Sequence, residues 1–70
     1  MKNVFEELDR ALGAYRALRE LDYARAEPFR IQIETAVVHG GKATEFRAIA
    51  DAIDAAYRAQ ALANANGGIR

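Results

Sequence analysis

The sequence predicts an all-α protein with a compact three-helix arrangement. Apolar residues recur at steps of three and four along residues 3–26 and 42–63, which is the spacing of one face of an α-helix. One proline and a pair of adjacent glycines set off a short middle segment, residues 28–39. We therefore expect two long amphipathic helices joined by a short third one, as a single domain over residues 1–66 with a flexible tail at residues 67–70.

The segment 42–63 carries the clearest helical pattern. Its apolar face consists of Phe46, Ile49, Ala50, Ile53, Ala56, Tyr57 and Ala61. On the opposite face, Arg47 with Asp51 and Asp54 with Arg58 are opposite charges four residues apart, and each pair is expected to contribute about 0.2–0.5 kcal/mol to helix stability. Alanine, the best intrinsic helix former, fills much of the remaining surface.

The first segment has a wider apolar surface. Its face is formed by Val4, Leu8, Ala11, Tyr15 and Leu18, and it is widened by Phe5, Leu12, Ala14 and Leu21. Asn3 is expected to cap the helix N-terminus. Gly13 lies in the interior of the helix, and we expect a close helix crossing there, with a kink as the alternative. A single partner helix covers only part of this surface, so either the third segment covers the remainder or some of it faces another molecule.

Pro28 is expected to end the first helix. Proline disfavours helical backbone at the preceding residue but is well tolerated as the first residue of a new helix. The sequence therefore predicts a tight corner between helices at residues 26–28.

The middle segment fits two periods. As a helix, Phe29, Ile33, Ala36 and Val37 share one face; as a strand, Phe29, Ile31, Ile33, Thr35 and Val37 alternate with polar residues. The rest of the sequence offers no second strand, so a short helix is favoured. The strand alternative would imply a dimer or a strand added to a partner's sheet. Gly40 and Gly41 are expected to end the segment in a glycine cap.

Composition narrows the classes of function. The chain has 70 residues, no cysteine, and ten basic against ten acidic side chains, so its net charge is zero. A nucleic-acid binder usually carries a positive excess, so the zero net charge argues against nucleic acid as a direct partner. No apolar run approaches the roughly 20 residues of a membrane span, and the N-terminus lacks the apolar core of a signal peptide. We expect a cytoplasmic protein with no membrane partner.

Residues that carry enzyme chemistry are sparse. His39 is the only histidine and there is no serine, so a Ser–His–Asp arrangement is impossible. The sequence Gly40-Gly41-Lys42 lacks the spacing and the preceding strand of a phosphate-binding loop. We therefore expect no enzyme activity, no catalytic residue, no metal and no cofactor.

The arginines and tyrosines suggest a protein-binding site instead, because both residue types are enriched at interfaces. The candidate partner-binding residues are Phe5, Leu12, Arg16, Arg19, Tyr23, Arg30 and Arg47. Two alternatives stay open. The segments on either side of Gly40-Gly41 could form a helix-turn-helix DNA-binding unit, or the apolar face could be buried in a structural homodimer.

In its size, its lack of cysteine and its lack of a catalytic constellation, the chain resembles the small accessory proteins with which phages and plasmids bind host machinery. Among these it most resembles a small phage-encoded regulator that binds bacterial RNA polymerase. The resemblance concerns the chain as a whole, and no residue role is carried over from it. It implies binding to the polymerase surface, with altered initiation or termination of transcription and no catalysis.

Overall fold

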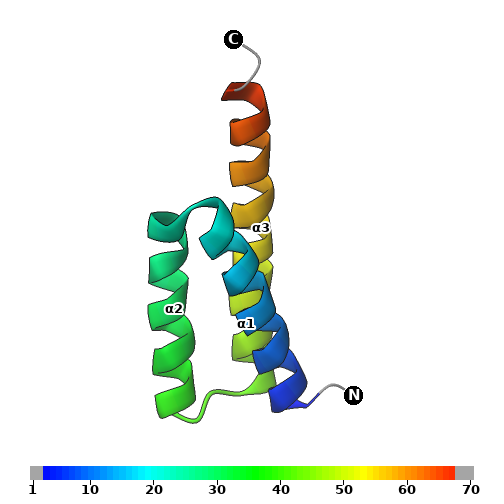
Figure 1. Cartoon of the computed structure of the whole chain (residues 1–70). Coiled ribbons are helices and arrows are strands. Elements are labelled where there is room, and N and C mark those ends of the chain that lie inside the picture. The colour runs from blue at the N-terminus through cyan, green and yellow to red at the C-terminus, as the bar shows by residue number, and fades with distance from the viewer. Residues whose placement is uncertain (1–2, 68–70) are drawn as a thin grey trace.

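The computed structural model describes residues 3–67, and within them the chain forms three helices (Figure 1). They are α1 (Val4–Leu21), α2 (Tyr23–Val38) and α3 (Ala43–Gly67). Consecutive helices run antiparallel, α1 packs most extensively against α3, and α2 makes its smallest contact with α3. The all-α, three-helix prediction is confirmed, and the middle segment is helical, so its strand alternative is wrong.

The start of α1 agrees with the prediction, and the end of α3 lies further along the chain than predicted. Asn3 caps α1 as expected, because its side-chain oxygen accepts a hydrogen bond from the Glu6 backbone N–H at 2.9 Å. The predicted tail begins at Gly67, which is instead the last residue of α3. The other three residues of that tail lie outside the described part of the chain.

The corner between α1 and α2 lies at Asp22, so the predicted corner at residues 26–28 is wrong. The extended backbone of Asp22 interrupts the helix. Its N–H donates to the Leu18 carbonyl at 2.8 Å, and its side chain accepts from the Arg25 N–H at 3.1 Å. Asp22 therefore satisfies backbone groups at the end of one helix and at the start of the next, as aspartate commonly does at an N-cap.

Pro28 lies inside α2 rather than at its first position. A proline within a helix cannot donate the usual hydrogen bond to the carbonyl four residues earlier, which here belongs to Ala24. Ala24 lies in the first turn of α2 and is exposed, so water can reach this part of the helix. The Ala24 carbonyl, which lacks the proline N–H as a partner, can therefore be hydrated, and Pro28 is tolerated near the start of α2.

The two glycines after α2 have distinct roles. Gly40 has φ +68°, the left-handed conformation expected of a residue that follows a helix end. The Gly40 and Gly41 N–H groups donate to the carbonyls of Val37 and Ala36, at 3.2 and 2.7 Å, which is the Schellman pattern. A Cβ on Gly41 would lie 2.9 Å from the Ala36 carbonyl oxygen, so this position requires glycine. The predicted glycine cap is confirmed.

The core is built from small and large apolar residues of all three helices. Its buried members are Ala11, Tyr15, Leu18, Ala26, Ile33, Ala50 and Ile53. Three of them are fully buried alanines, one on each helix, so alanine permits close helix packing here. Gly13 is exposed, and a Cβ built on it would meet nothing within 4 Å. The expected close crossing at Gly13 is therefore wrong.

Helix α3 continues well past the corner that joins α1 and α2 (Figure 1). Ile53 is the last buried residue of α3 among the described residues, and Leu62, nine residues later, has an exposed apolar side chain. Among the helices of residues 3–67, none combines the length and apolar character that a membrane crossing requires.

Candidate interaction groove between α1 and α2

Helix α2 exposes apolar side chains on more than one side. Ile31 is exposed, Val37 is 50% exposed and Val38 is 79% exposed, while Ile33 of the same helix is buried in the core. The helix touches α1 on one side and α3 only lightly on another. Because the apolar residues of α2 are spread over more than one side of the helix, packing against α1 and α3 leaves part of them in contact with water.

Part of this surface lines a groove between α1 and α2. Its central hollow, about 370 Å³, is lined by Leu8, Leu12, Ile33, Glu34, Val37 and Val38. A second hollow of about 270 Å³ shares Leu12, Ile33 and Glu34 with it and adds Tyr15, Arg16, Arg19 and Arg30. A third, of about 130 Å³, shares Leu8 and Val37 and is otherwise lined by Val4, Phe5, Gly40, Gly41 and Phe46. Because neighbouring hollows share residues, we treat them as one feature, the α1–α2 groove.

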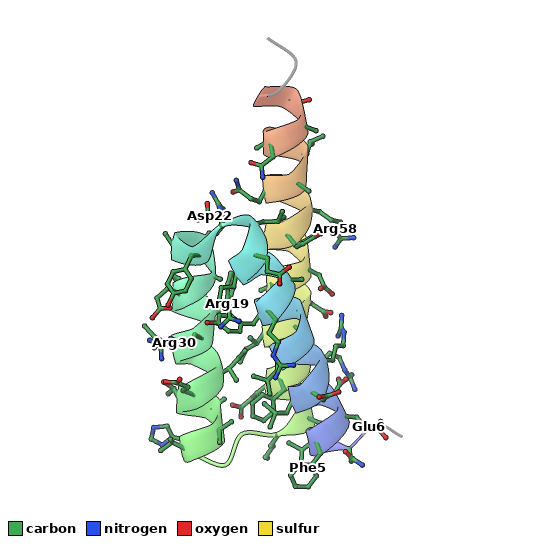
Figure 2. All side chains as sticks on the ribbon, viewed as in Figure 1. Phe5, Glu6, Arg19, Asp22, Arg30 and Arg58 are labelled. Carbon is green, nitrogen blue, oxygen red and sulfur yellow. The ribbon has the colours of Figure 1, made fainter. Side chains whose placement is uncertain are left out.

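The two ends of the α1–α2 groove differ in charge. Figure 2 shows Phe5 at the start of α1 and Arg19 near its end, close to the corner at Asp22. The residues that line the Phe5 end carry no charge. The residues that line the Arg19 end include three arginines and one glutamate. The groove is therefore apolar along most of its length and basic at one end.

The arginines at the basic end are held in two different ways. Arg30 is paired within α2: its Nη1 donates to Glu34 Oε2 at 2.8 Å and its Nε donates to Glu27 Oε1 at 2.9 Å. The hydrogen bond to Glu27 has the largest effect on the pKa of Arg30, and together with the bond to Glu34 it raises that pKa. The same Arg30–Glu27 hydrogen bond lowers the pKa of Glu27. The Arg19 guanidinium instead lies over the Tyr15 ring, 5.5 Å from its centroid. Within residues 3–67, neither Arg16 nor Arg19 forms an ion pair.

The structure brings together four of the seven predicted partner-binding residues. Leu12, Arg16, Arg19 and Arg30 line the same hollow at the basic end of the groove. Phe5, which is 75% exposed, lines the opposite end.

The other two predicted residues lie elsewhere. Tyr23 is exposed at the first position of α2 and lines none of the three hollows. Arg47 lies on α3, and its Nε donates to Glu7 Oε2 at 2.6 Å. Arg47 therefore lies apart from the three arginines that line the groove.

The acidic residues of α3 also pair differently from the prediction. Arg10 Nη2 donates to Asp51 Oδ1 at 2.7 Å and to Asp54 Oδ2 at 2.9 Å. These bonds, led by the one to Asp51, raise the pKa of Arg10. The expected pairs within α3, Arg47 with Asp51 and Asp54 with Arg58, are therefore replaced by pairs that link α3 to α1. The reason is that α1 and α3 lie side by side, which brings Arg10 within reach of both aspartates.

Sequence reasoning missed Leu8, Val37 and Val38 as candidate groove residues. The sequence places Val37 on the same helical face as the buried Ile33, so nothing in the pattern indicates its exposure. A signal was present only for Val38. Val38, which belongs to neither face in the sequence, is the most exposed large apolar residue of α2.

The groove can bind apolar side chains along its length and a carboxylate at its basic end, since arginine pairs well with carboxylates. His39 lies outside it, in a depression between α2 and α3. Across residues 3–67, no group of three or more histidine, cysteine, aspartate or glutamate side chains is arranged to hold a metal ion.

No family model matches the chain, and no curated protein or solved structure shows significant similarity to it.

Proposed function

We propose that this protein is a non-enzymatic protein-interaction module that binds its partner through the α1–α2 groove. The observation that carries the proposal is the exposure of Val37 and Val38 beside Leu8 and Leu12 in one continuous hollow. Contiguous exposed apolar surface of this kind commonly marks an interaction site in a small protein. The arginines at one end add the directional contacts that such surfaces use for specificity.

The resemblance to phage accessory proteins suggests host RNA polymerase as the first partner to test. In that role the chain would act in the cytoplasm and change initiation or termination of transcription by occupying a polymerase surface. Such a role requires no catalytic residue, which agrees with the scarcity of reactive side chains in the sequence.

Binding to purified bacterial RNA polymerase tests the proposal. The double variant Val37→Asn/Val38→Asn should weaken binding about tenfold, which corresponds to roughly 1.4 kcal/mol, while the thermal unfolding midpoint stays close to that of the wild type. The matched control is Tyr57→Asn/Leu62→Asn, which makes the same type of change at exposed residues of α3 and should bind as the wild type does. Equal binding by the groove variant and the wild type would refute the groove as the binding surface.

A homodimer that buries the same groove is the main alternative outcome. Sedimentation at micromolar concentration distinguishes it, because the proposal expects a monomer. A dimer that dissociates in the Val37→Asn/Val38→Asn variant would assign the groove to a second copy of the chain instead.

Direct DNA binding through the turn at Gly40-Gly41 is less favoured. At the start of α3, Arg47 is engaged by Glu7, and Glu45 adds negative charge. A mobility-shift titration checks this alternative, since DNA binding through phosphate contacts weakens steeply as salt rises.

A further inference from the structure

We propose that the partner segment of the α1–α2 groove is an amphipathic helix with a row of apolar side chains and acidic residues at one end only. The inference rests on the proposed function, because it names the class of segment that the same groove binds. It follows from the length of the groove, the nature of its walls and the difference in charge between its ends.

The length and shape of the groove fit a helix. From Phe5 to Arg19 the groove follows α1 for 14 residue steps, or about 21 Å at 1.5 Å per residue, which is close to four helical turns. Both walls are helices, and within residues 3–67 there is no strand to which an extended peptide could add. Binding of a helix in an apolar groove is therefore the favoured recognition mode.

The central and Phe5-end hollows require apolar side chains from the partner. Leu8, Leu12, Val37 and Val38 supply an apolar surface, and the Phe5 end adds no charged residue. Glu34 is the one acid of the central hollow, and its carboxylate is already paired with Arg30. A partner with charged side chains along this stretch would lose their hydration without gaining an ion pair.

The Arg19 end requires an acidic partner. Arg16 and Arg19 form no ion pair within residues 3–67, whereas Arg30 is already paired with Glu27 and Glu34. The uncompensated positive charge of the hollow therefore comes from Arg16 and Arg19. Arg19 is held over the buried Tyr15 ring, and stacking of this kind leaves the edge of a guanidinium free to donate hydrogen bonds. A carboxylate on the partner therefore meets a partly pre-positioned donor at this end and at no other point of the groove.

The test uses the full chain and three fluorescent synthetic helical peptides that share one row of leucines. The first has glutamates at its N-terminal end, the second has them at its C-terminal end, and the third has lysines at both places. Fluorescence anisotropy at low salt should show that one glutamate peptide binds at least about tenfold more tightly than the lysine peptide. This preference should shrink as salt rises, because exposed charges are screened.

Variants of the chain locate the preference. Arg16→Glu/Arg19→Glu should reverse it in favour of the lysine peptide, while the matched control Arg25→Glu/Arg58→Glu, which changes two exposed arginines outside the groove, should preserve it. Val37→Asn/Val38→Asn should weaken all three peptides.

The outcomes separate this inference from the proposed function. Equal binding of glutamate and lysine peptides, with all of them weakened by the valine variant, overturns the acidic end and leaves the groove as the binding surface. The inference is likewise overturned when no peptide binds but polymerase binding still depends on the two valines. When neither peptide nor polymerase binding depends on them, the proposed function fails as well.

Discussion

Arg47 of α3 donates from Nε to Glu7 Oε2 of α1 at 2.6 Å, across 40 positions of sequence. The pair is asymmetric, because the Glu7 side chain is 1% exposed while the Arg47 side chain is 50% exposed. Glu7 is the one charged residue of the chain's described part that is buried. The negative charge of Glu7 is therefore compensated by Arg47, whereas the guanidinium of Arg47 can also be solvated by water.

The asymmetry of this pair predicts unequal effects of removing each partner. Arg47→Ala should destabilise the fold by about 2 kcal/mol, because a buried carboxylate loses its partner. Glu7→Gln should cost less, about 1 kcal/mol, because the amide retains a hydrogen-bond acceptor and Arg47 remains hydrated. Urea unfolding of both variants measures the difference. A larger loss in Glu7→Gln than in Arg47→Ala would contradict the asymmetry.

The Glu27–Arg30 pair predicts a dependence of stability on acid. The hydrogen bond from Arg30 lowers the pKa of Glu27 below its ordinary value of 4.5. A carboxylate with a lowered pKa in the folded state contributes stability that is fully present above its unfolded pKa and is lost as the pH falls through the folded pKa. The melting temperature of the wild type should therefore fall more steeply below pH 4.5 than that of Glu27→Gln. Thermal melts followed by circular dichroism across this range test it, and parallel curves would count against the pair.

Replacing Gly13 or Gly41 by alanine should change the free energy of unfolding in opposite directions. Gly13→Ala should stabilise the fold by about 0.5–1 kcal/mol, because the added Cβ meets nothing and alanine favours the helix. Gly41→Ala should destabilise it, because the Cβ would approach the Ala36 carbonyl oxygen to 2.9 Å. Chemical denaturation of the two variants provides the comparison. The prediction fails if Gly13→Ala unfolds at a lower urea concentration than the wild type.

Truncation of an apolar side chain should cost more stability in the first half of α3 than in the second half. Ile53 is fully buried, so Ile53→Ala should cost about 2–5 kcal/mol. Leu62 is exposed and follows the last buried residue of α3, so Leu62→Ala should change the free energy of unfolding by no more than about 0.5 kcal/mol. A large loss on changing Leu62 would show that this part of α3 is packed in solution, for instance against a second copy.

Local signals in the sequence were sufficient for much of the fold. The Asn3 cap and the glycine cap after α2 both depend on hydrogen bonds between residues a few positions apart, so they are readable from neighbouring residues. The corner between α1 and α2 is an exception, because Pro28 and Asp22 are both residue types that commonly mark a helix boundary. The aspartate cap determined the boundary, and proline was accommodated within the helix.

The candidate site was only partly predictable. Residue type predicts Leu12, Arg16, Arg19 and Arg30 as interface residues, and the antiparallel packing of α1 and α2 brings them into one hollow. Residue type also predicts Arg47, but Arg47 lies against Glu7, because α3 packs on the other side of α1. Residue type alone cannot distinguish an arginine that meets a buried acid from one that faces a groove.

The sequence by itself determined the helices, since periodicity, caps and propensity act within a few residues of each other. Only the tertiary structure decided which charges pair and which apolar residues stay exposed. Glu7 with Arg47, and Arg10 with Asp51 and Asp54, are more than 39 positions apart and meet only because α1 lies along α3. Val37 and Val38 remain exposed because the apolar residues of α2 lie on more than one side, while the helix packs on α1 and only lightly on α3.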